Sequence, residues 1–247
     1  MIRFDGISKE YKEGITGKGV KAVEDLTLEI EQGEVFGFLG PNGAGKSTTI
    51  KILMDLIFPD KGKAEIANND SRDPKARRSV GYLPENPYFY DYLTANELLW
   101  FGGKTAGMHS GSIRERSDLL IAKVDLQSAR NRALRSYSKG MLQRVGLALA
   151  LIHDPQVVIL DEPMSGLDPI GRKMVGDLLL ELKGQGKTVF FSSHILNDVE
   201  RFSDRAGIIV RGRLTLIDSL RNLLTGGNTL EDVFMRQVAL HEGGAAA

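Results

Sequence analysis

Nine consecutive residues near the start of the chain have the spacing of a phosphate-binding loop. They fit the pattern Gly-x-x-x-x-Gly-Lys-Ser/Thr and read Gly40-Pro41-Asn42-Gly43-Ala44-Gly45-Lys46-Ser47-Thr48. In such a loop the glycines let backbone amides point at a phosphate, at a helix start whose dipole also favours anions. Lys46 then reaches the β- and γ-phosphates, and the Ser47 hydroxyl is a Mg²⁺ ligand. The alternative, a glycine-rich turn with a surface lysine, is disfavoured because the segment lies between a strand and a helix.

Two carboxylates follow a short apolar run later in the chain. Residues 157–160 are all apolar, and Asp161 and Glu162 come next. An uninterrupted apolar run is typical of a parallel strand covered on both faces, and such sheets bind ligands at the carboxyl ends of their strands. We therefore predict that Asp161 holds Mg²⁺, directly or through water, and that Glu162 polarises an attacking water. Taken alone, such a pair also fits an ordinary loop start; the phosphate-binding loop upstream favours the catalytic interpretation.

The elements around these two motifs predict an α/β fold. Alternating apolar residues over 20–30 indicate a half-buried antiparallel strand, and the apolar run 34–39 indicates a strand that leads into the phosphate-binding loop. A helix should follow the loop and end before Pro59. Further strands are expected at residues 2–7, 63–67 and 80–83.

The pattern becomes helical between about residues 86 and 152. Two sequences there have the spacing of a capping box, in which a hydroxyl and a carboxylate each satisfy an amide of the first helical turn: Thr94 with Glu97, and Ser112 with Glu115. Strands and helices then alternate again, as expected for a parallel sheet with a helical insertion. The expected strands are 157–160, 188–191, 207–210 and 214–217, and the expected helices are 173–182, 195–202 and a last one from Thr229.

Composition excludes several classes of protein. The 247 residues include 32 Lys plus Arg and 32 Asp plus Glu, so the net charge is 32 − 32 = 0, which argues against binding nucleic acid mainly through charge. The absence of cysteine excludes disulfides, thiolate metal sites and sulfur redox chemistry. The first residues do not resemble a signal peptide, and the longest apolar run, 147–152, is too short to span a bilayer. We expect the chain alone not to cross a membrane.

Three further segments accompany the loop and the carboxylates. They are Tyr137-Ser138-Lys139-Gly140-Met141-Leu142-Gln143-Arg144, Ser165-Gly166-Leu167-Asp168 and Ser192-Ser193-His194. In this order the motifs closely resemble the ATP-binding subunits of ABC transporters, over nearly the whole chain. The resemblance implies an ABC ATPase domain at 1–225, with a P-loop NTPase (RecA-like) core at 1–85 and 154–225 that includes an N-terminal antiparallel β subdomain. An α-helical subdomain is inserted at 86–153, and a C-terminal helix with a disordered tail occupies 226–247.

The segment around Ser138 corresponds to a family sequence that reads Leu-Ser-Gly-Gly-Gln. Ser138 and Gly140 match it, whereas Tyr137, Lys139 and Met141 differ. A serine and free amides at a helix start still form an anion site. The resemblance implies that this site binds the γ-phosphate held by the phosphate-binding loop of a second copy, so that two ATP molecules join a head-to-tail dimer. A serine that only caps a helix is the alternative.

Four other positions receive roles from the resemblance. His194 matches a histidine that contacts the γ-phosphate and helps to position water, against the alternative of a structural histidine. Asp168 is implied at the dimer interface, where it couples the two sites. Tyr11 corresponds to an aromatic that stacks on adenine, unless it only packs under a loop. Glu85 stands where the family usually has a glutamine that reaches toward Mg²⁺ and water. Its negative charge beside the γ-phosphate predicts that activity depends more strongly on Mg²⁺.

Two clusters lie near Glu85 or shortly before it. The aromatics Tyr82, Tyr88, Phe89, Tyr90 and Tyr92 suit either a groove for a short helix of a membrane partner or the filling between two lobes. The basic run Arg72, Lys75, Arg77 and Arg78 is most simply a solvated loop, with contact to lipid headgroups as the alternative.

Together, these features predict an ATP-hydrolysing motor subunit of an ABC exporter. It should bind ATP and Mg²⁺, dimerise with a second copy or a homologous ATPase subunit, and drive separate ABC-2-type transmembrane permease subunits, without a nucleic-acid partner. The expected location is cytoplasmic, peripheral on the inner face of the cell membrane through the permease. Three features resemble the exporter branch of the family that pairs with separate ABC-2-type membrane subunits: Glu85, the Ser138 segment and residues 229–234.

Three alternative classes fit less well. ABC proteins that act on DNA or ribosomes usually carry two ATP-binding halves or a long coiled-coil insertion, whereas this chain has one set of motifs. A nucleotide-binding regulator without turnover should lack the base at Glu162. A GTPase or nucleotide kinase does not account for the segment 138–144, and no Asn-Lys-x-Asp sequence is present.

Overall fold

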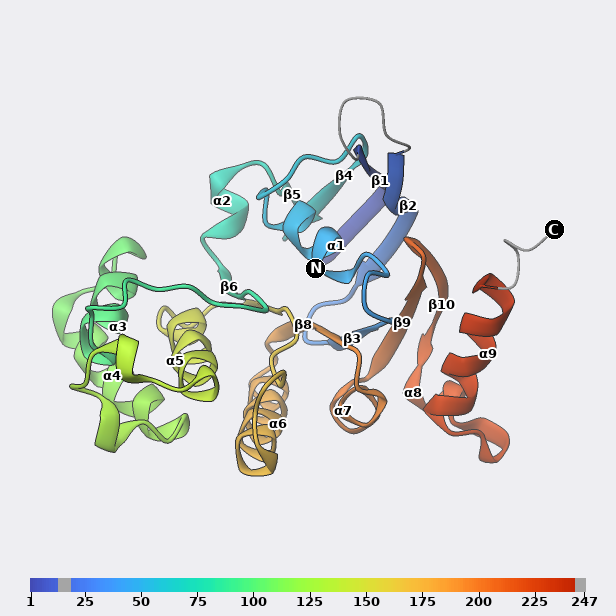
Figure 1. Cartoon of the computed structure of the whole chain (residues 1–247). Helices are drawn as coiled ribbons and strands as arrows, with labels where there is room; N and C mark the ends of the chain where they lie inside the picture. Colours follow the sequence, from blue (N-terminus) through green and yellow to red (C-terminus); the bar gives the residue numbers. More distant parts are fainter. Residues whose placement is uncertain (13–18, 243–247) are drawn as a thin grey trace. The chain divides into compact units, whose positions relative to one another are not determined.

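The chain divides into two compact units. Unit 1 combines Met1–Arg77 with Phe190–Ala247, and unit 2 is Arg78–Val189. The computed structural model describes residues 1–12 and 19–242 (Figure 1). The sequence also predicts a glycine-rich loop at 11–19. Residues 13–18 of this loop, and the tail predicted to be disordered, lie outside the described residues. Residues 11–12 and 19 belong to strands, so the loop is shorter than predicted. The subdomain boundaries predicted at 85/86 and 153/154 stay a prediction. The two compact units are groups of residues in mutual contact, and such a division does not test where functional subdomains begin and end.

The first part of unit 1 is an antiparallel sheet with strand order β2-β1-β4-β5. Its strands are β1 (Ile2–Lys12), β2 (Gly19–Ile30), β4 (Lys61–Ile66) and β5 (Asn69–Asp70). In β1, Ile2 pairs with Ile30 of β2 on one side and with Ile66 of β4 on the other. Leu26, Leu28 and Ile30 are buried while the residues between them are exposed, so the predicted half-buried antiparallel strand is confirmed.

A second group of strands in unit 1 has the order β10-β9-β3-β8. These strands are β3 (Val35–Leu39), β8 (Thr188–Ser193), β9 (Arg205–Val210) and β10 (Arg213–Ser219). β3 runs parallel to β9, and β10 returns antiparallel along β9. The boundary between the two units falls within β8.

Helices complete unit 1. They are α1 (Lys46–Leu53), α2 (Pro74–Arg77), α7 (Leu196–Phe202), α8 (Leu220–Leu223) and α9 (Leu230–Glu242). The last helix begins where the sequence predicts, because Thr229 and Asp232 cap it reciprocally: the Asp232 amide donates to Thr229 Oγ1 at 3.2 Å, and the Thr229 amide donates to Asp232 Oδ2 at 2.9 Å.

Unit 2 consists of helices and a short pair of parallel strands. The strands are β6 (Val80–Leu83) and β7 (Val157–Leu160), in which Val80 pairs with Val157. The helices are α3 (Ala95–Thr105), α4 (Ser110–Lys123), α5 (Lys139–Leu151) and α6 (Pro169–Gly184), with 3₁₀ turns η1 (Gln127–Ala129) and η2 (Leu134–Ser136). The helices α3, α4 and α5 pack against one another, as the helical pattern of this region predicts.

One of the two predicted capping boxes is wrong. The box of Thr94 and Glu97 is present at the start of α3. In α4, however, the helix begins two residues before Ser112, and His109 is the capping residue without a side-chain bond. A Ser-x-x-Glu spacing also occurs inside a helix, where preceding residues continue the helical hydrogen bonds, so the spacing alone did not fix the boundary.

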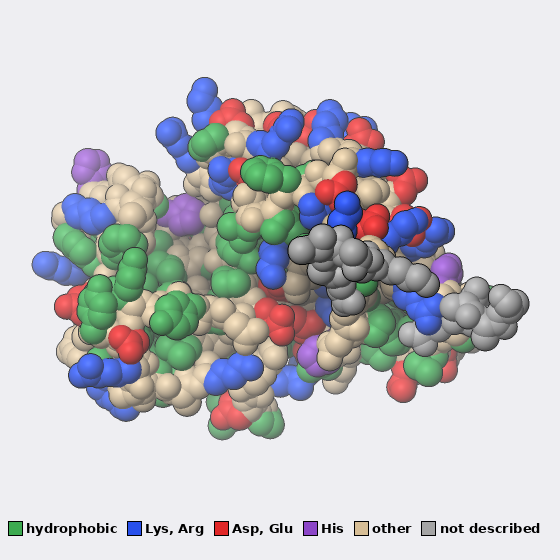
Figure 2. Space-filling model, turned by 45° about the horizontal axis from the view of Figure 1, so that its top comes forward, with side chains coloured by type: hydrophobic (Ala, Val, Ile, Leu, Met, Phe, Trp, Pro, Cys, Tyr) green, Lys and Arg blue, Asp and Glu red, His purple; other side chains and the backbone are tan. Residues whose placement is uncertain are grey.

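The equal numbers of basic and acidic residues are reflected in the charges on the surface. On the face shown in Figure 2, Lys and Arg side chains are interspersed with Asp and Glu, which occur in equal numbers in the sequence. None of the helices in the described ranges combines the length and the apolar character needed to cross a membrane.

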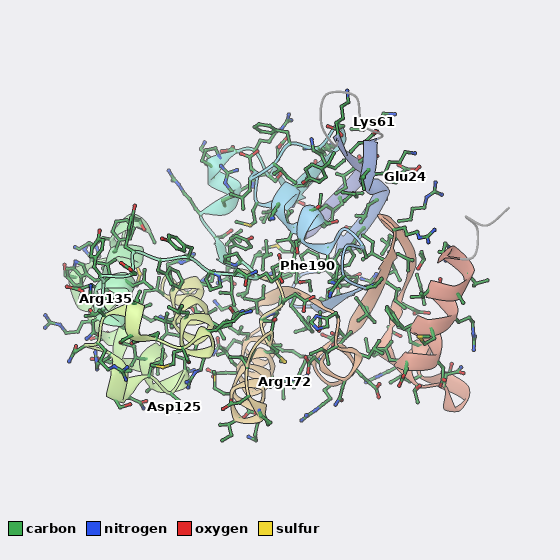
Figure 3. The ribbon with its side chains drawn as sticks, in the orientation of Figure 1. Glu24, Lys61, Asp125, Arg135, Arg172 and Phe190 are labelled. Atoms are coloured by element: carbon green, nitrogen blue, oxygen red, sulfur yellow. The ribbon has the colours of Figure 1, made fainter. Side chains whose placement is uncertain are left out.

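An aromatic cluster forms the centre of unit 1 around Phe190 (Figure 3). The ring centroid of Phe190 lies 6.1 Å from that of Phe4 in β1. It lies 6.1 Å from the centroid of Phe36 and 5.5 Å from that of Phe38, and both of these residues belong to β3. All four rings are buried. Because Phe4 belongs to the antiparallel sheet and the other two to the second group of strands, Phe190 joins the two sheets of this unit.

We predict that Phe190→Ala lowers the free energy of unfolding by about 3–5 kcal/mol, because it removes a buried ring and leaves a cavity between the sheets. Phe58→Ala is the matched control, since Phe58 is 68% exposed, and it should change stability by less than about 0.5 kcal/mol. Urea denaturation followed by circular dichroism measures both. Equal shifts of the two midpoints would contradict this account of the core.

Candidate active site

The predicted phosphate-binding loop is the turn between β3 and α1 in unit 1. β3 is buried throughout and ends at Leu39, and α1 begins at Lys46. Within the turn, the Ala44 amide donates to the Pro41 carbonyl at 3.2 Å, and the Ala44 carbonyl accepts from the Gly212 amide at 2.8 Å. The strand–loop–helix context that the motif requires is therefore present.

Gly45 is the position at which this turn depends most on glycine. Its φ is 108°, in the left-handed region, and a Cβ there would lie 2.2 Å from the Ala22 carbonyl oxygen. Gly40 is also tightly enclosed, because a Cβ would lie 2.5 Å from the Ile209 carbonyl oxygen. Neighbouring strands thus force the loop backbone into one path, which leads directly into the first amides of α1.

The side chains of the loop are held by its own backbone. Lys46 is buried, and its Nζ donates to the carbonyls of Gly40 at 2.7 Å and Pro41 at 3.2 Å. Thr49 Oγ1 donates to the Gly45 carbonyl at 3.0 Å. Ser47 is half-buried at the first turn of α1. A fixed ammonium and a hydroxyl at a helix start are an arrangement suited to a phosphate with its counter-cation.

Two other predicted residues belong to unit 1. Tyr11 lies near the end of β1 opposite Val20, is 42% exposed, and has Lys9 Nζ 6.0 Å from its ring centroid. His194 directly follows β8 and is exposed. The turn that presents it is fixed by Ser193, whose Oγ accepts from the Ile195 amide at 2.9 Å.

The predicted carboxylate pair follows β7 in unit 2. Asp161 and Glu162 are 1% and 7% exposed, so both carboxylates are held at a buried strand end. The Asp161 amide donates to the Leu83 carbonyl at 2.8 Å, which continues the pairing between β6 and β7. Glu162 has a φ of 51°, an unusual left-handed conformation for a residue with a side chain. Such strain is typical of functional positions.

Gln143 supports this strand end, and the sequence analysis did not assign it a role. It lies on α5 and is 2% exposed. Its Nε2 donates to the carbonyls of Glu162 at 3.4 Å and Pro163 at 3.5 Å. A polar residue within the apolar face of α5 was the available signal, because buried amides need hydrogen-bond partners.

Glu85 and Tyr82 flank the end of β6, the strand that pairs with β7. Glu85 is exposed, unlike Asp161 and Glu162. Tyr82 lies opposite Ile159 in the parallel register and is half-buried. Burial raises the pKa of Tyr82 to about 12, and the negative charge of Asp161 acts in the same direction. The phenol therefore stays neutral beside the carboxylate across the physiological pH range.

The segments around Ser138 and Asp168 contact each other in unit 2. Ser138 caps α5, and its Oγ accepts from the Met141 amide at 3.2 Å. Asp168 caps α6, and its Oδ1 accepts from the Gly171 amide at 2.7 Å. A Cβ on Gly140 would lie 3.4 Å from Leu167 Cδ2. In unit 2 the capped starts of α5 and α6 therefore lie next to each other, and both capping residues, Ser138 and Asp168, are exposed.

The predicted site residues are divided between the two units. Unit 1 holds Tyr11, the loop 40–48 and His194, and unit 2 holds Glu85, Ser138, Gly140, Asp161, Glu162 and Asp168. Within unit 2, Glu85 and the carboxylate pair follow neighbouring strands, and the Ser138 segment packs against the Asp168 segment. Each unit therefore carries a helix start suited to an anion, α1 in one and α5 in the other.

Comparison with known proteins identifies relatives of this chain. The sequence matches the ABC transporter family over residues 23–165. An uncharacterized ABC transporter ATP-binding protein of Synechocystis is 48% identical over 88% of this chain and 62% of its own length. The bacitracin transport ATP-binding protein of Bacillus licheniformis is 42% identical over 78% of this chain and 63% of its own length. The chain spans less than two thirds of the length of these two relatives.

A solved structure shows the same fold. It is a dimeric ATP-binding cassette in a post-hydrolysis state bound to ADP and Pi, 29% identical, with a TM-score of 0.81 over 90% of this chain and 99% of that one. The predicted P-loop NTPase fold, with an antiparallel β part and a helical part, is confirmed. Because the family match covers more than half of the chain, and the motifs lie at the expected strand and helix ends, this chain belongs to the ABC transporter family as an ATP-binding domain.

Proposed function

We propose that the chain is the ATP-hydrolysing motor of an ABC exporter, which works as a head-to-tail dimer attached to separate ABC-2-type permease subunits. The observation that carries this proposal is the presence, in one chain, of two helix starts suited to an anion, α1 after Gly45 and α5 after Ser138, together with the buried carboxylates at the end of β7. A single nucleotide needs only one such helix start for its phosphates, so the second suits a phosphate held by another copy.

The phosphate-binding loop and its neighbours hold ATP in this proposal. The amides of 40–48 and the Lys46 ammonium bind the β- and γ-phosphates, and Tyr11 stacks on adenine. Its exposure of 42% leaves a face of the ring accessible for this contact. Lys46 would exchange its bonds to the loop carbonyls for bonds to phosphate oxygens.

Mg²⁺ fits the oxygen donors that the chain offers. Ser47 contributes a hydroxyl and Asp161 a carboxylate, and Mg²⁺ prefers a few oxygen ligands together with waters and substrate phosphates. Glu85, which is exposed, adds a further carboxylate at the end of the neighbouring strand. When bound, the ion neutralises negative charge on the phosphates during phosphoryl transfer.

Glu162 is the proposed general base. It accepts a proton as water attacks the γ-phosphorus, a new P–O bond forms, and the bond to the bridging oxygen of ADP breaks. The buried strand end and the bonds from Gln143 hold its backbone in one conformation. His194 lies on an ordered turn after β8 and positions the water and the γ-phosphate.

The second copy completes each site in the proposed dimer. Ser138, Gly140 and the first amides of α5 bind the γ-phosphate held by the other copy, and Asp168 lies at the interface. The solved relative with ADP and Pi is a dimer, which supports an assembly of two such domains. A homologous ATPase subunit could take the place of the second copy.

The permease subunit is proposed to dock near Glu85. Tyr88, Tyr90 and Tyr92 are 95%, 62% and 64% exposed, and the rings of the last two lie 5.8 Å apart. This exposure supports contact with a partner helix over filling of the domain interior. The Bacillus licheniformis relative is a bacitracin transport ATP-binding protein, which supports a role in transport. In this proposal the chain is cytoplasmic and is attached to the inner face of the membrane through the permease.

We predict that Glu162→Gln keeps ATP binding but lowers the hydrolysis rate by about 100-fold or more, because the amide cannot accept the proton from water. The variant should accumulate as an ATP-bound dimer, seen by light scattering. Glu115→Gln is the matched control, since Glu115 is an exposed glutamate on α4. Wild-type hydrolysis by Glu162→Gln would show that another group is the base.

We also predict that Gly45→Ala weakens ATP binding at least about tenfold, because the added methyl group meets the Ala22 carbonyl and displaces the loop amides. Gly184→Ala is the control, because a Cβ there meets nothing within 4 Å. Titration with a fluorescent ATP analogue measures both. Unchanged affinity of a folded Gly45→Ala protein would show that the amides of this loop do not bind the phosphates.

A further inference from the structure

Unit 2 contains a cavity that the proposed ATP chemistry does not use. Its volume is about 350 Å³, and it is lined by Asn96, Trp100, Arg114, Ser117, Asp118 and Arg130. The volume is at the lower end of the range of small-molecule sites. The cavity therefore has room for a ligand of about one aromatic ring with a short side chain.

Helical spacing brings these residues to one place. On α3, Asn96 and Trp100 are four residues apart, and on α4, Arg114 is followed at three and four residues by Ser117 and Asp118. Residues with these spacings share one face of a helix. The helices α3 and α4 pack against each other (Figure 1), so the two faces form facing walls, and Arg130 closes the cavity from the end of η1.

Arg130 is fixed in position by hydrogen bonds on one side of its guanidinium. Its Nε and Nη2 donate to Asn96 Oδ1 at 3.1 and 2.9 Å, and Nη2 also donates to Asp118. Asn96 in turn donates to Asn131 Oδ1 at 2.7 Å, so its amide is already engaged. No bond of Nη1 is found within the described residues, which leaves this group available for an acceptor in the cavity.

Two further donors line the cavity without a protein partner. Ser117 lines the cavity at 6% relative exposure, and no hydrogen bond of its hydroxyl is found among the residues that the structure describes. The Ser117 oxygen is not fully enclosed, so a ligand in the cavity can reach it. Arg114, one turn earlier on the same face, likewise forms no ion pair or hydrogen bond within residues 1–12 and 19–242.

Trp100 adds an apolar wall. Its side chain is 40% exposed, and Lys104 Nζ lies 5.0 Å from the ring centroid while also donating to Ser110 Oγ at 2.8 Å. The indole is thus held by a neighbour on its own helix. An aromatic ligand gains contact area against such a ring without ordering a flexible side chain.

The charges of the lining residues select the ligand. Arg114 and Arg130 contribute two positive charges and Asp118 one negative charge, a net of 2 − 1 = +1. A single carboxylate balances this charge and matches the paired donors of a guanidinium.

We propose that this cavity binds a small organic monoanion, a carboxylate attached to an aromatic ring. The carboxylate accepts hydrogen bonds from Arg114, from Nη1 of Arg130 and from the Ser117 hydroxyl, and the ring packs against Trp100. None of these residues is assigned to ATP, so a test of this ligand site does not depend on whether the proposed ATPase function is correct.

The sequence provides a direct reporter, because Trp100 is the single tryptophan of the chain. Titration of the full chain with 3-phenylpropionate should change the tryptophan fluorescence saturably, with a Kd of about 1 mM or tighter. The neutral isostere 3-phenylpropanamide should bind at least about tenfold more weakly, because it lacks the charge that the arginines recognise.

Variants separate the site from general surface effects. Arg114→Gln should weaken binding at least about tenfold, and Ser117→Ala about threefold or more, since each removes one donor. Arg135→Gln is the matched control: Arg135, labelled in Figure 3, is an exposed arginine on η2 that does not line the cavity, and its loss should leave the Kd unchanged. The absence of saturable change, equal affinity for acid and amide, or equal effects of Arg114→Gln and Arg135→Gln would each overturn the proposal.

Discussion

The backbone path through Gly45 is the constraint on which the phosphate-binding half of the structure depends. With a φ of 108° and the Ala22 carbonyl 2.2 Å from where a Cβ would be, the loop has one way to pass between its neighbouring strands. That path sets the direction of α1 and of its first amides. The strands β2 and β9, which supply Ala22 and Ile209, are thus parts of the site although they carry none of its predicted side chains.

In unit 2, too, local backbone geometry fixes the direction of helix starts and of their first amides, but capping side chains take the place of the glycine. Ser138 and Asp168 cap α5 and α6, so that backbone amides and short polar side chains face outward at adjoining helix starts. Behind them, the buried Gln143 of α5 is bonded to the carbonyls of Glu162 and Pro163. A displacement of α5 therefore changes both the anion site at its start and the strand end that carries the proposed base.

Local sequence signals predicted the motif positions well, because each of them combines backbone geometry with a distinct residue pattern. The β3–loop–α1 turn, the capped starts at Thr94 and Ser138, and the strand before Asp161 are found where the patterns place them. Features that depend on long-range packing were not predictable. Examples are the start of α4 at Ser110, the left-handed Glu162, and the bonds of Gln143 to a segment 19 and 20 residues later. The arginine, serine and tryptophan of the α3–α4 cavity also become a cluster only through the packing of two helices.

In the proposed dimer, each catalytic site combines the loop of one copy with the Ser138 segment of another. An experiment that mixes two inactive variants distinguishes this arrangement from sites that are complete within one copy. Lys46→Ala removes the loop ammonium, and Ser138→Glu places a negative charge where the γ-phosphate should bind. A dimer of one copy of each contains one site with both parts intact. An equal mixture should therefore recover about a quarter of the wild-type ATPase rate, since half of the dimers are mixed and each of these has one intact site out of two. A mixture no more active than the two variants measured separately would contradict it.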